Sequence, residues 1–291
     1  MWKEHVLPTA DLQLAWYEAG DGPAVVFLHG GPGDDHSYLR PLAEPLTRQF
    51  RCILYDQRGS GHSHLTELHE ETLHINRFFD DLEALRLHLT QPHLRLVGHS
   101  WGATLALLYG VSFPHQLERM ALIGLGPLSQ DLTAVASANL LRPLSRPERE
   151  EFERLSTERR LARESGDLQK HRQLHLQLVT DYNVRSWFYS PEAAERFRTQ
   201  YRAIYSYNPL VATYLLPSVR QMQDQVWERL SQVTAPVLIL YGYQDFEPIT
   251  QACLLTASLP QAQVAFLNEC GHVPWLEQPE RCTQALETFL R

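Results

Sequence analysis

The segment that most constrains the fold of this chain is Gly98-His99-Ser100-Trp101-Gly102. An apolar run from Leu94 to Gly98 leads into it, and an apolar helical pattern from Gly102 to Val111 follows it. A Gly-x-Ser-x-Gly sequence in this context predicts a sharp strand-to-helix turn, where the glycines leave room for closely packed backbone. Such a turn raises the serine hydroxyl above the end of its strand, so Ser100 is the predicted nucleophile.

The first part of the chain alternates short β-rich runs with longer helical patterns, which predicts a parallel sheet with crossover helices. Near-continuous apolar runs indicate strands that are buried on both faces. The predicted strands are Leu12 to Glu18, Ala24 to His29, Arg51 to Asp56, Leu94 to Gly98, Met120 to Gly124, Pro236 to Tyr241 and Gln263 to Leu267. The predicted covering helices are Asn76 to Leu89, Gly102 to Val111 and Pro279 to Leu290.

The pattern changes in the middle of the chain, from about residue 127 to about residue 232. This segment is rich in Arg, Glu, Gln and Leu, with helical periodicity and no convincing strand. Strand character returns after it, so the sheet is expected to resume. The sequence therefore predicts a core domain made of residues 1–126 and 233–291, with residues 127–232 as a helical cap over it.

Composition excludes several classes of function. A formal net charge of −8 argues against a nucleic-acid partner, because Lys and Arg supply most of the affinity for phosphates. The chain shows no secretory leader and no apolar stretch of the roughly 18 residues that a membrane span needs, so we expect a cytoplasmic protein without a membrane partner. The cysteines lack CxxC spacing and are expected to be free and buried: Cys52, Cys253, Cys270 and Cys282.

A serine hydroxyl becomes a good nucleophile when an imidazole removes its proton and a carboxylate holds that imidazole in the right tautomer. Asp245 lies just beyond one predicted strand, and His272 lies just beyond the next. Open α/β sheets place their active sites at the carboxyl ends of the strands. We therefore expect His272 to be the general base and Asp245 to orient it, with Glu247 as the reserve candidate for the acid.

The negative charge that develops on the substrate also needs backbone N–H donors, which work best where no side chain blocks the approach. His29-Gly30-Gly31-Pro32-Gly33 follows a predicted strand and resembles a glycine-rich oxyanion loop. The predicted donors are the amides of Gly31 and Trp101, with Gly30 as the neighbour that could replace Gly31.

No metal or cofactor is expected. His171 and His175 are spaced i, i+4 and could share a metal ion, but no acidic or cysteine third ligand stands in helical register with them. Asp56 and Arg58 belong to a turn at the end of a strand and are expected to organise the loops beneath the site.

Three motifs together resemble one family. These are His29-Gly30-Gly31-Pro32-Gly33, Asp56-Gln57-Arg58-Gly59-Ser60-Gly61-His62-Ser63 and Gly98-His99-Ser100-Trp101-Gly102. With Asp245 and Gly271-His272 at the acid and base positions, they look like the proline iminopeptidase group of α/β-hydrolases. The resemblance implies the α/β-hydrolase fold, with eight mainly parallel strands and a helical cap between the sixth and seventh. It also implies no cofactor, and release of an N-terminal proline or related residue from a small or short-peptide substrate.

The resemblance weakens in the cap. Family members that cleave N-terminal residues hold the substrate's ammonium group with cap carboxylates, and their usual Glu-Asn-His-Tyr-type segment is absent here. Glu192 and Glu195 are the candidate carboxylates, although their surroundings fit a solvated amphipathic helix equally well.

Other residues offer alternatives for binding substrate. Asp34 and Asp35 follow the oxyanion loop, and either one could bind an ammonium group or cap the next helix. Trp187 belongs to an aromatic cluster of the cap that could line an acyl or prolyl pocket, or pack as ordinary core.

The sequence favours a serine hydrolase that works through an acyl-enzyme, most simply an aminopeptidase of the proline iminopeptidase type. A carboxylesterase or amidase acting on small apolar acyl groups is the alternative. A hydrolase-like protein that binds a ligand without turning it over is a third.

Overall fold

The computed structural model describes residues 1–291, apart from the side chain of Asp224. One sheet of eight strands runs in the order β1-β2-β4-β3-β5-β6-β7-β8. Strand β2 is antiparallel to both of its neighbours, and every pair from β4 to β8 is parallel. The strands are β1 (Lys3–Pro8), β2 (Gln13–Ala19), β3 (Ala24–Leu28), β4 (Arg51–Tyr55), β5 (Leu94–His99), β6 (Leu117–Ile123), β7 (Val237–Gly242) and β8 (Ala262–Leu267). The predicted mostly parallel α/β fold is confirmed.

The structure recovers all seven predicted strands, and β1 adds the eighth that the family resemblance implied. The predicted helices become α2 (Ile75–His88), α3 (Trp101–Ser112) and α12 (Pro279–Leu290). The remaining helices of eight or more residues are α4 (Gln130–Leu141), α5 (Arg146–Glu164), α6 (Leu168–Leu178), α8 (Pro191–Ile204), α9 (Pro209–Arg229) and α10 (Thr250–Ser258). The short ones are α1 (Arg40–Ala43), α7 (Val184–Trp187), α11 (Pro274–Glu277), the 3₁₀ turns η1 (Ser37–Leu39), η2 (Glu44–Arg48), η3 (Pro114–Gln116) and η5 (Leu230–Gln232), and the π turn η4 (Val179–Asn183).

Two apolar layers cover the two faces of the sheet. Successive side chains of a strand point to opposite faces. In β3, Val26 and Leu28 pack on the side of α2, α3 and α9, while Val25 and Phe27 pack on the side of α1 and α12. All four side chains are almost fully buried, which explains why this strand is apolar at every position.

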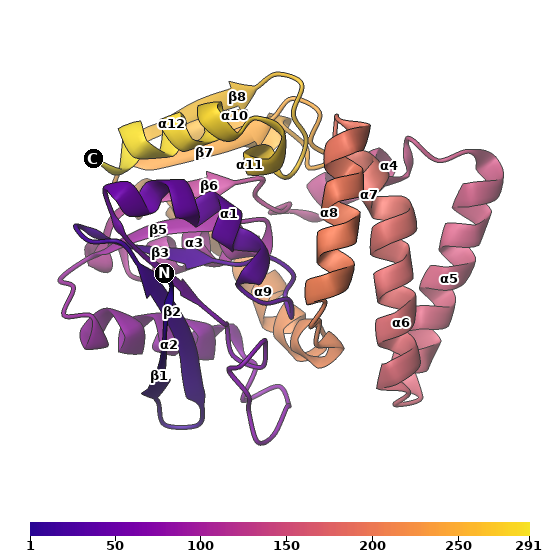
Figure 1. Ribbon diagram of the computed structural model, residues 1–291, viewed down its shortest axis with the longest axis horizontal. Helices are drawn as coiled ribbons and strands as arrows, with labels where there is room; N and C mark the ends of the chain where they lie inside the picture. The colour runs from indigo at the N-terminus through magenta and orange to yellow at the C-terminus, as the bar shows by residue number, and fades with distance from the viewer.

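Between β6 and β7 the described residues form helices and turns from α4 to η5, with no strand. Figure 1 shows α5, α6 and α8 standing side by side beyond one end of the sheet, while α9 returns to the core. There α9 packs against α2 and α3. We call residues 127–232 the cap, as in the sequence prediction. Among the described residues, no helix combines the length and apolarity needed to cross a membrane.

Three of the four free cysteines are buried, as expected: Cys52, Cys270 and Cys282. The prediction was wrong for Cys253, which is exposed on α10.

Candidate active site

Ser100 stands at the sharp turn between β5 and α3. Its backbone has φ 56° and ψ −122°, a conformation that L-residues rarely adopt and that costs energy. The close packing depends on Gly102, because a Cβ there would lie only 2.1 Å from the carbonyl oxygen of Leu28. The predicted strand-turn-helix context of Ser100 is therefore present.

His272 and Asp245 meet at the same end of the sheet. Asp245 lies beyond the end of β7 and His272 beyond the end of β8. The imidazole Nδ1 is 3.0 Å from Oδ1 and 3.1 Å from Oδ2 of Asp245, and both side chains are nearly inaccessible to solvent. This contact uses Nδ1, so Nε2 is the ring nitrogen left to exchange a proton with a serine.

Ser100 and His272 both line a cavity of about 350 Å³. Its wall also contains Gly30, Gly31 and Trp187, which were predicted from the sequence to bind substrate or the oxyanion. Glu247, the reserve acid, lines the cavity as well, but the carboxylate that contacts the His272 ring belongs to Asp245.

The two glycines of the oxyanion loop differ in their hydrogen bonds. The Gly30 amide donates to the hydroxyl of Tyr38 at 2.5 Å, so it is already engaged. Gly31 has φ 112°, a conformation that glycine adopts without strain, and its amide makes no hydrogen bond among the described residues. Trp101 is the first residue of α3, and the first amides of a helix lack partners within it. The geometry thus favours Gly31 over Gly30 as a donor.

Tyr38 was not found from the sequence, yet it connects the oxyanion loop to the histidine. Its hydroxyl is 2.9 Å from Nδ1 of His99, and Nε2 of His99 is 2.9 Å from the carbonyl oxygen of His272. Since a carbonyl only accepts, His99 carries its proton on Nε2, and Tyr38 must donate to Nδ1. Burial and the neighbouring His272 hold the pKa of His99 well below its usual range, which favours the neutral form of the His99 ring. No local sequence signal marks Tyr38, because the contact depends on folding.

Asp34 and Asp35 have different surroundings. Asp35 accepts hydrogen bonds from the amide of Ser37 (2.8 Å) and from the hydroxyl of Ser206 (2.5 Å). Its carboxylate therefore stabilises the start of the turn η1. Asp34 lines the cavity and accepts a hydrogen bond from Tyr201 of α8 at 2.9 Å. Burial raises the pKa of Asp34 to about 6, against the lowering effect of Tyr201.

The cap carboxylates predicted to bind substrate lie elsewhere. Glu192 and Glu195 are exposed on α8 and line a separate surface hollow, not the cavity of Ser100. Glu192 accepts from Ser190, and Glu195 pairs with Arg198. Their assignment as substrate-binding residues is corrected, because the amphipathic helix turns its apolar face, with Phe197, toward the cavity.

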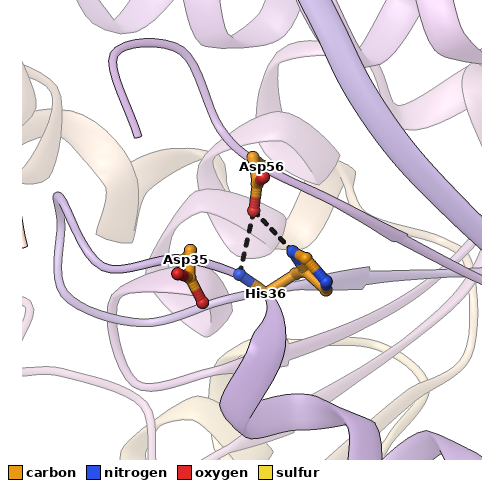
Figure 2. A group of neighbouring side chains, drawn as sticks. All are labelled: Asp35, His36 and Asp56. Atoms are coloured by element: carbon orange, nitrogen blue, oxygen red, sulfur yellow. Dashed lines mark hydrogen bonds and ion pairs between the residues drawn. The ribbon is translucent and has the colours of Figure 1, made fainter. Parts of the chain in front are cut away.

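One cluster has the composition of a metal site, namely Asp35, His36 and Asp56. Figure 2 shows that Asp56 instead accepts two hydrogen bonds from His36, at 3.0 Å from the amide and 2.7 Å from Nδ1. Burial opposes ionisation of Asp56, but these contacts outweigh it and lower its pKa to about 2. Arg40 lies 3.2 Å from the other ring nitrogen of His36. A cluster whose oxygens and nitrogens are already paired is suited to holding loops together, not to binding a cation.

The other predicted metal candidates are also engaged. His171 donates to the carbonyl oxygen of Arg159, and His175 donates to the hydroxyl of Tyr205, which itself donates to the carbonyl oxygen of Arg172. His175 stacks on Tyr207 and forms part of the cavity wall.

The fold and this arrangement define a hydrolase. The profile of the alpha/beta hydrolase fold family matches residues 23–279, and the chain belongs to that family. It is a proline iminopeptidase-like member. It is 25% identical over 276 residues to the proline iminopeptidase of Lactobacillus helveticus, covering 94% of this chain and 91% of that one. A probable proline iminopeptidase of Leptolyngbya boryana is 28% identical over 300 residues, covering 93% and 88%.

Solved structures show the same fold. A thermophilic esterase from Thermogutta terrifontis superposes with a TM-score of 0.73 at 22% identity, covering 99% of this chain and 98% of the other. The proline iminopeptidase of Mycobacterium smegmatis superposes with a TM-score of 0.70, also at 22% identity, covering 99% and 97%.

Proposed function

We propose that this enzyme is a serine hydrolase in which Ser100 attacks a substrate carbonyl while His272 takes its proton. The observation that carries the proposal is the contact of His272 Nδ1 with Asp245, in a cavity that Ser100 also lines. Asp245 holds the proton on Nδ1, which leaves Nε2 free to act as the base. Such a pair converts a weakly nucleophilic hydroxyl into a catalyst at neutral pH.

The amides of Gly31 and Trp101 would stabilise the oxyanion of the tetrahedral intermediate. Donors fixed in advance around the developing charge are often the largest single contribution to such catalysis. His272 then gives its proton to the leaving group and activates the water that hydrolyses the acyl-enzyme. Tyr38 and His99 are positioning residues, since they tie the oxyanion loop to the backbone of His272.

For the substrate, we propose an aminopeptidase that releases an N-terminal residue. Asp34 supports this, because it presents a carboxylate to the cavity three residues after Gly31. A free N-terminus carries an ammonium group, and a partly buried carboxylate is the natural partner for it. The bound cation would lower the pKa of Asp34 and ionise it.

A carboxylesterase is the second candidate. The observation that favours it is the aromatic and aliphatic wall of the cavity, which includes Trp187, Phe197, Tyr207, Leu216 and Phe246. Such a wall would accept an uncharged acyl group without any contact to Asp34.

The test compares three substrates with wild type and Ser100→Ala: proline β-naphthylamide, its N-acetylated form, and p-nitrophenyl butyrate. We expect Ser100→Ala to lower kcat by at least about 10⁴-fold on every substrate that the wild type hydrolyses. An aminopeptidase should cleave the free amine and lose activity on the acetylated form. Turnover of the butyrate alone would establish the esterase.

An unchanged rate in Ser100→Ala would overturn the serine mechanism. A phosphonate that labels Ser100 without any substrate being turned over would identify a ligand-binding homologue.

A further inference from the structure

Gln57 is a buried polar residue that the proposed mechanism does not use. It follows β4, which is paired with β3, and β3 is in turn paired with β5. The two proposed oxyanion donors follow the other two strands, since Gly31 comes after β3 and Trp101 comes after β5. Gln57 therefore lies at the end of the sheet where both donor segments begin.

The side-chain amide of Gln57 joins these two segments. Its Nε2 donates to the carbonyl oxygen of His29 at 2.7 Å, and its Oε1 accepts from the indole Nε1 of Trp101, also at 2.7 Å. A backbone carbonyl only accepts and an indole only donates, so a single orientation of the Gln57 amide satisfies both. The segments also touch directly, because a Cβ on Gly102 would lie 2.7 Å from the same carbonyl oxygen of His29.

The backbone amide of Gln57 fixes the ring of His29. It donates to Nε2 of the ring at 3.0 Å, while Nδ1 lies 2.9 Å from the carbonyl oxygen of Gly30. Because Nε2 accepts, the proton of the neutral ring is on Nδ1 and is donated to Gly30. Burial lowers the pKa of His29, which favours this neutral form. The ring of His29 is therefore held between Gln57 and Gly30.

The carbonyl of Gly30 belongs to the same peptide unit as the N–H of Gly31. In a planar trans peptide the C=O and the N–H point in opposite directions. A rotation of this unit would redirect the Gly31 N–H and would break the hydrogen bond from His29 to Gly30. The direction of the Gly31 N–H thus depends on His29, and the position of His29 depends on Gln57.

We propose that Gln57 is a positioning residue for the oxyanion hole, which holds the amides of Gly31 and Trp101 in the spacing and direction that the tetrahedral intermediate needs. The inference rests on the proposed function, because it adds a residue to the same site. Donors fixed in advance stabilise the developing charge without reorganising during the reaction. Loss of Gln57 should therefore slow the chemical step and leave substrate binding nearly unchanged.

The test replaces the carbonyl oxygen of the substrate by sulfur, which is larger and accepts hydrogen bonds more weakly. The pair is p-nitrophenyl butyrate with p-nitrophenyl thionobutyrate or, for an enzyme that cleaves only the amide, proline β-naphthylamide with its thioamide. Relative to hydrolysis by hydroxide, the wild type should favour the oxygen compound in kcat/KM by at least about 100-fold, since one oxyanion donor contributes about 10²–10³-fold.

Gln57→Leu should lower kcat on the oxygen compound by about 30-fold, with KM within about 3-fold of the wild-type value. It should also lower the oxygen-to-sulfur ratio by about 10-fold, because misaligned donors no longer distinguish the two atoms.

Trp101→Phe is a second, milder variant, since it removes the indole N–H and keeps the backbone amide at that position. It should lower the oxygen-to-sulfur ratio by about 3-fold. Added to Gln57→Leu it should have little further effect, because the contact that it removes is then already lost. If Gln57→Leu does not fold, Trp101→Phe decides, and an unchanged ratio in that variant would overturn the proposal.

Gln251→Leu is the matched control. Gln251 is also completely buried, and its side chain accepts from the amide of Leu128 at 2.7 Å and donates to the carbonyl oxygen of Gly126 at 3.0 Å, in the loop after β6. This variant loses a comparable set of hydrogen bonds, but it should keep the oxygen-to-sulfur ratio of the wild type. Circular dichroism and melting temperature establish that each variant is folded.

A folded Gln57→Leu variant that keeps the wild-type kcat and ratio would overturn the role of Gln57 alone. The same holds if Gln251→Leu lowers the ratio as much as Gln57→Leu does, since the effect would then follow from any buried loss. If Ser100→Ala hydrolyses these compounds as fast as the wild type, the serine mechanism fails, and the positioning role fails with it.

Discussion

Asp34, the proposed partner of a substrate ammonium group, has a charge whose burial costs stability. Its pKa of about 6 in the folded protein lies above the ordinary value of 3.8. The folded state therefore holds the proton more tightly than the unfolded chain between about pH 4 and pH 6. The contribution of Asp34 to the free energy of unfolding is fully present below about pH 4 and is lost as the pH rises through about 6.

Asp34→Asn should therefore raise the melting temperature at pH 7.5 by roughly 3 °C, since the amide has no charge to bury. The gain should shrink toward zero at pH 4, where the aspartate is itself protonated. The same variant should lose at least 10-fold in kcat/KM on free-amine substrates. Differential scanning calorimetry at both pH values checks the first effect, with the exposed Asp131→Asn as control. A gain that is independent of pH would contradict the argument.

At the scale of elements, Arg58 joins the loop after β4 to α2. Its guanidinium donates to both carboxylate oxygens of Asp81, at 2.8 Å and 2.6 Å, and also to Asp11 and to the carbonyl oxygen of Thr72. Arg58 and Asp81 are almost completely buried. The turn predicted to organise loops thus does so through a buried ion pair.

Breaking one side of a buried ion pair leaves an uncompensated charge. Asp81→Ala should lower the free energy of unfolding by about 3–5 kcal/mol, whereas the double variant Arg58→Met with Asp81→Leu should lose less, because it removes both charges. Urea unfolding followed by tryptophan fluorescence measures both values. A double variant as unstable as Asp81→Ala would show that packing, not charge, dominates here.

At the scale of the whole molecule, Glu277 connects the cap to the core. Its carboxylate accepts from the amides of Tyr189 (2.8 Å) and Ser190 (2.7 Å) in the cap, and from the amide of Gly271 (2.6 Å), next to His272. The amide of His272 in turn donates to the carbonyl oxygen of Trp187 at 2.6 Å. The position of the proposed base therefore depends on the docking of the cap.

Glu277→Ala should destabilise the protein by about 3 kcal/mol, because charge-assisted hydrogen bonds are lost and three amide donors are left unpaired. It should also lower kcat more than it raises KM, since misplacement of a reacting group acts on the chemical step. Chemical denaturation and steady-state kinetics check the two effects, with the exposed Glu280→Ala as control. A stable variant with normal kcat would mean that the cap docks without Glu277.

The sequence by itself determined seven of the eight strands, the mostly parallel fold and the turn of Ser100, because hydrophobic pattern and glycine spacing are local properties of a chain. Placing Asp245 and His272 at neighbouring strand ends was also possible, since the carboxyl ends of parallel strands meet at one edge.

Only the tertiary structure decided which polar residues face the cavity. It placed Asp34 in the cavity wall, whereas the carboxylate of Asp35 accepts a hydrogen bond from the amide of Ser37. It also paired the Gly30 amide with Tyr38 and left Glu192 and Glu195 on the surface. The sequence offered each of these as alternatives. Their outcome depends on contacts between segments far apart in the chain, and such contacts have no local pattern.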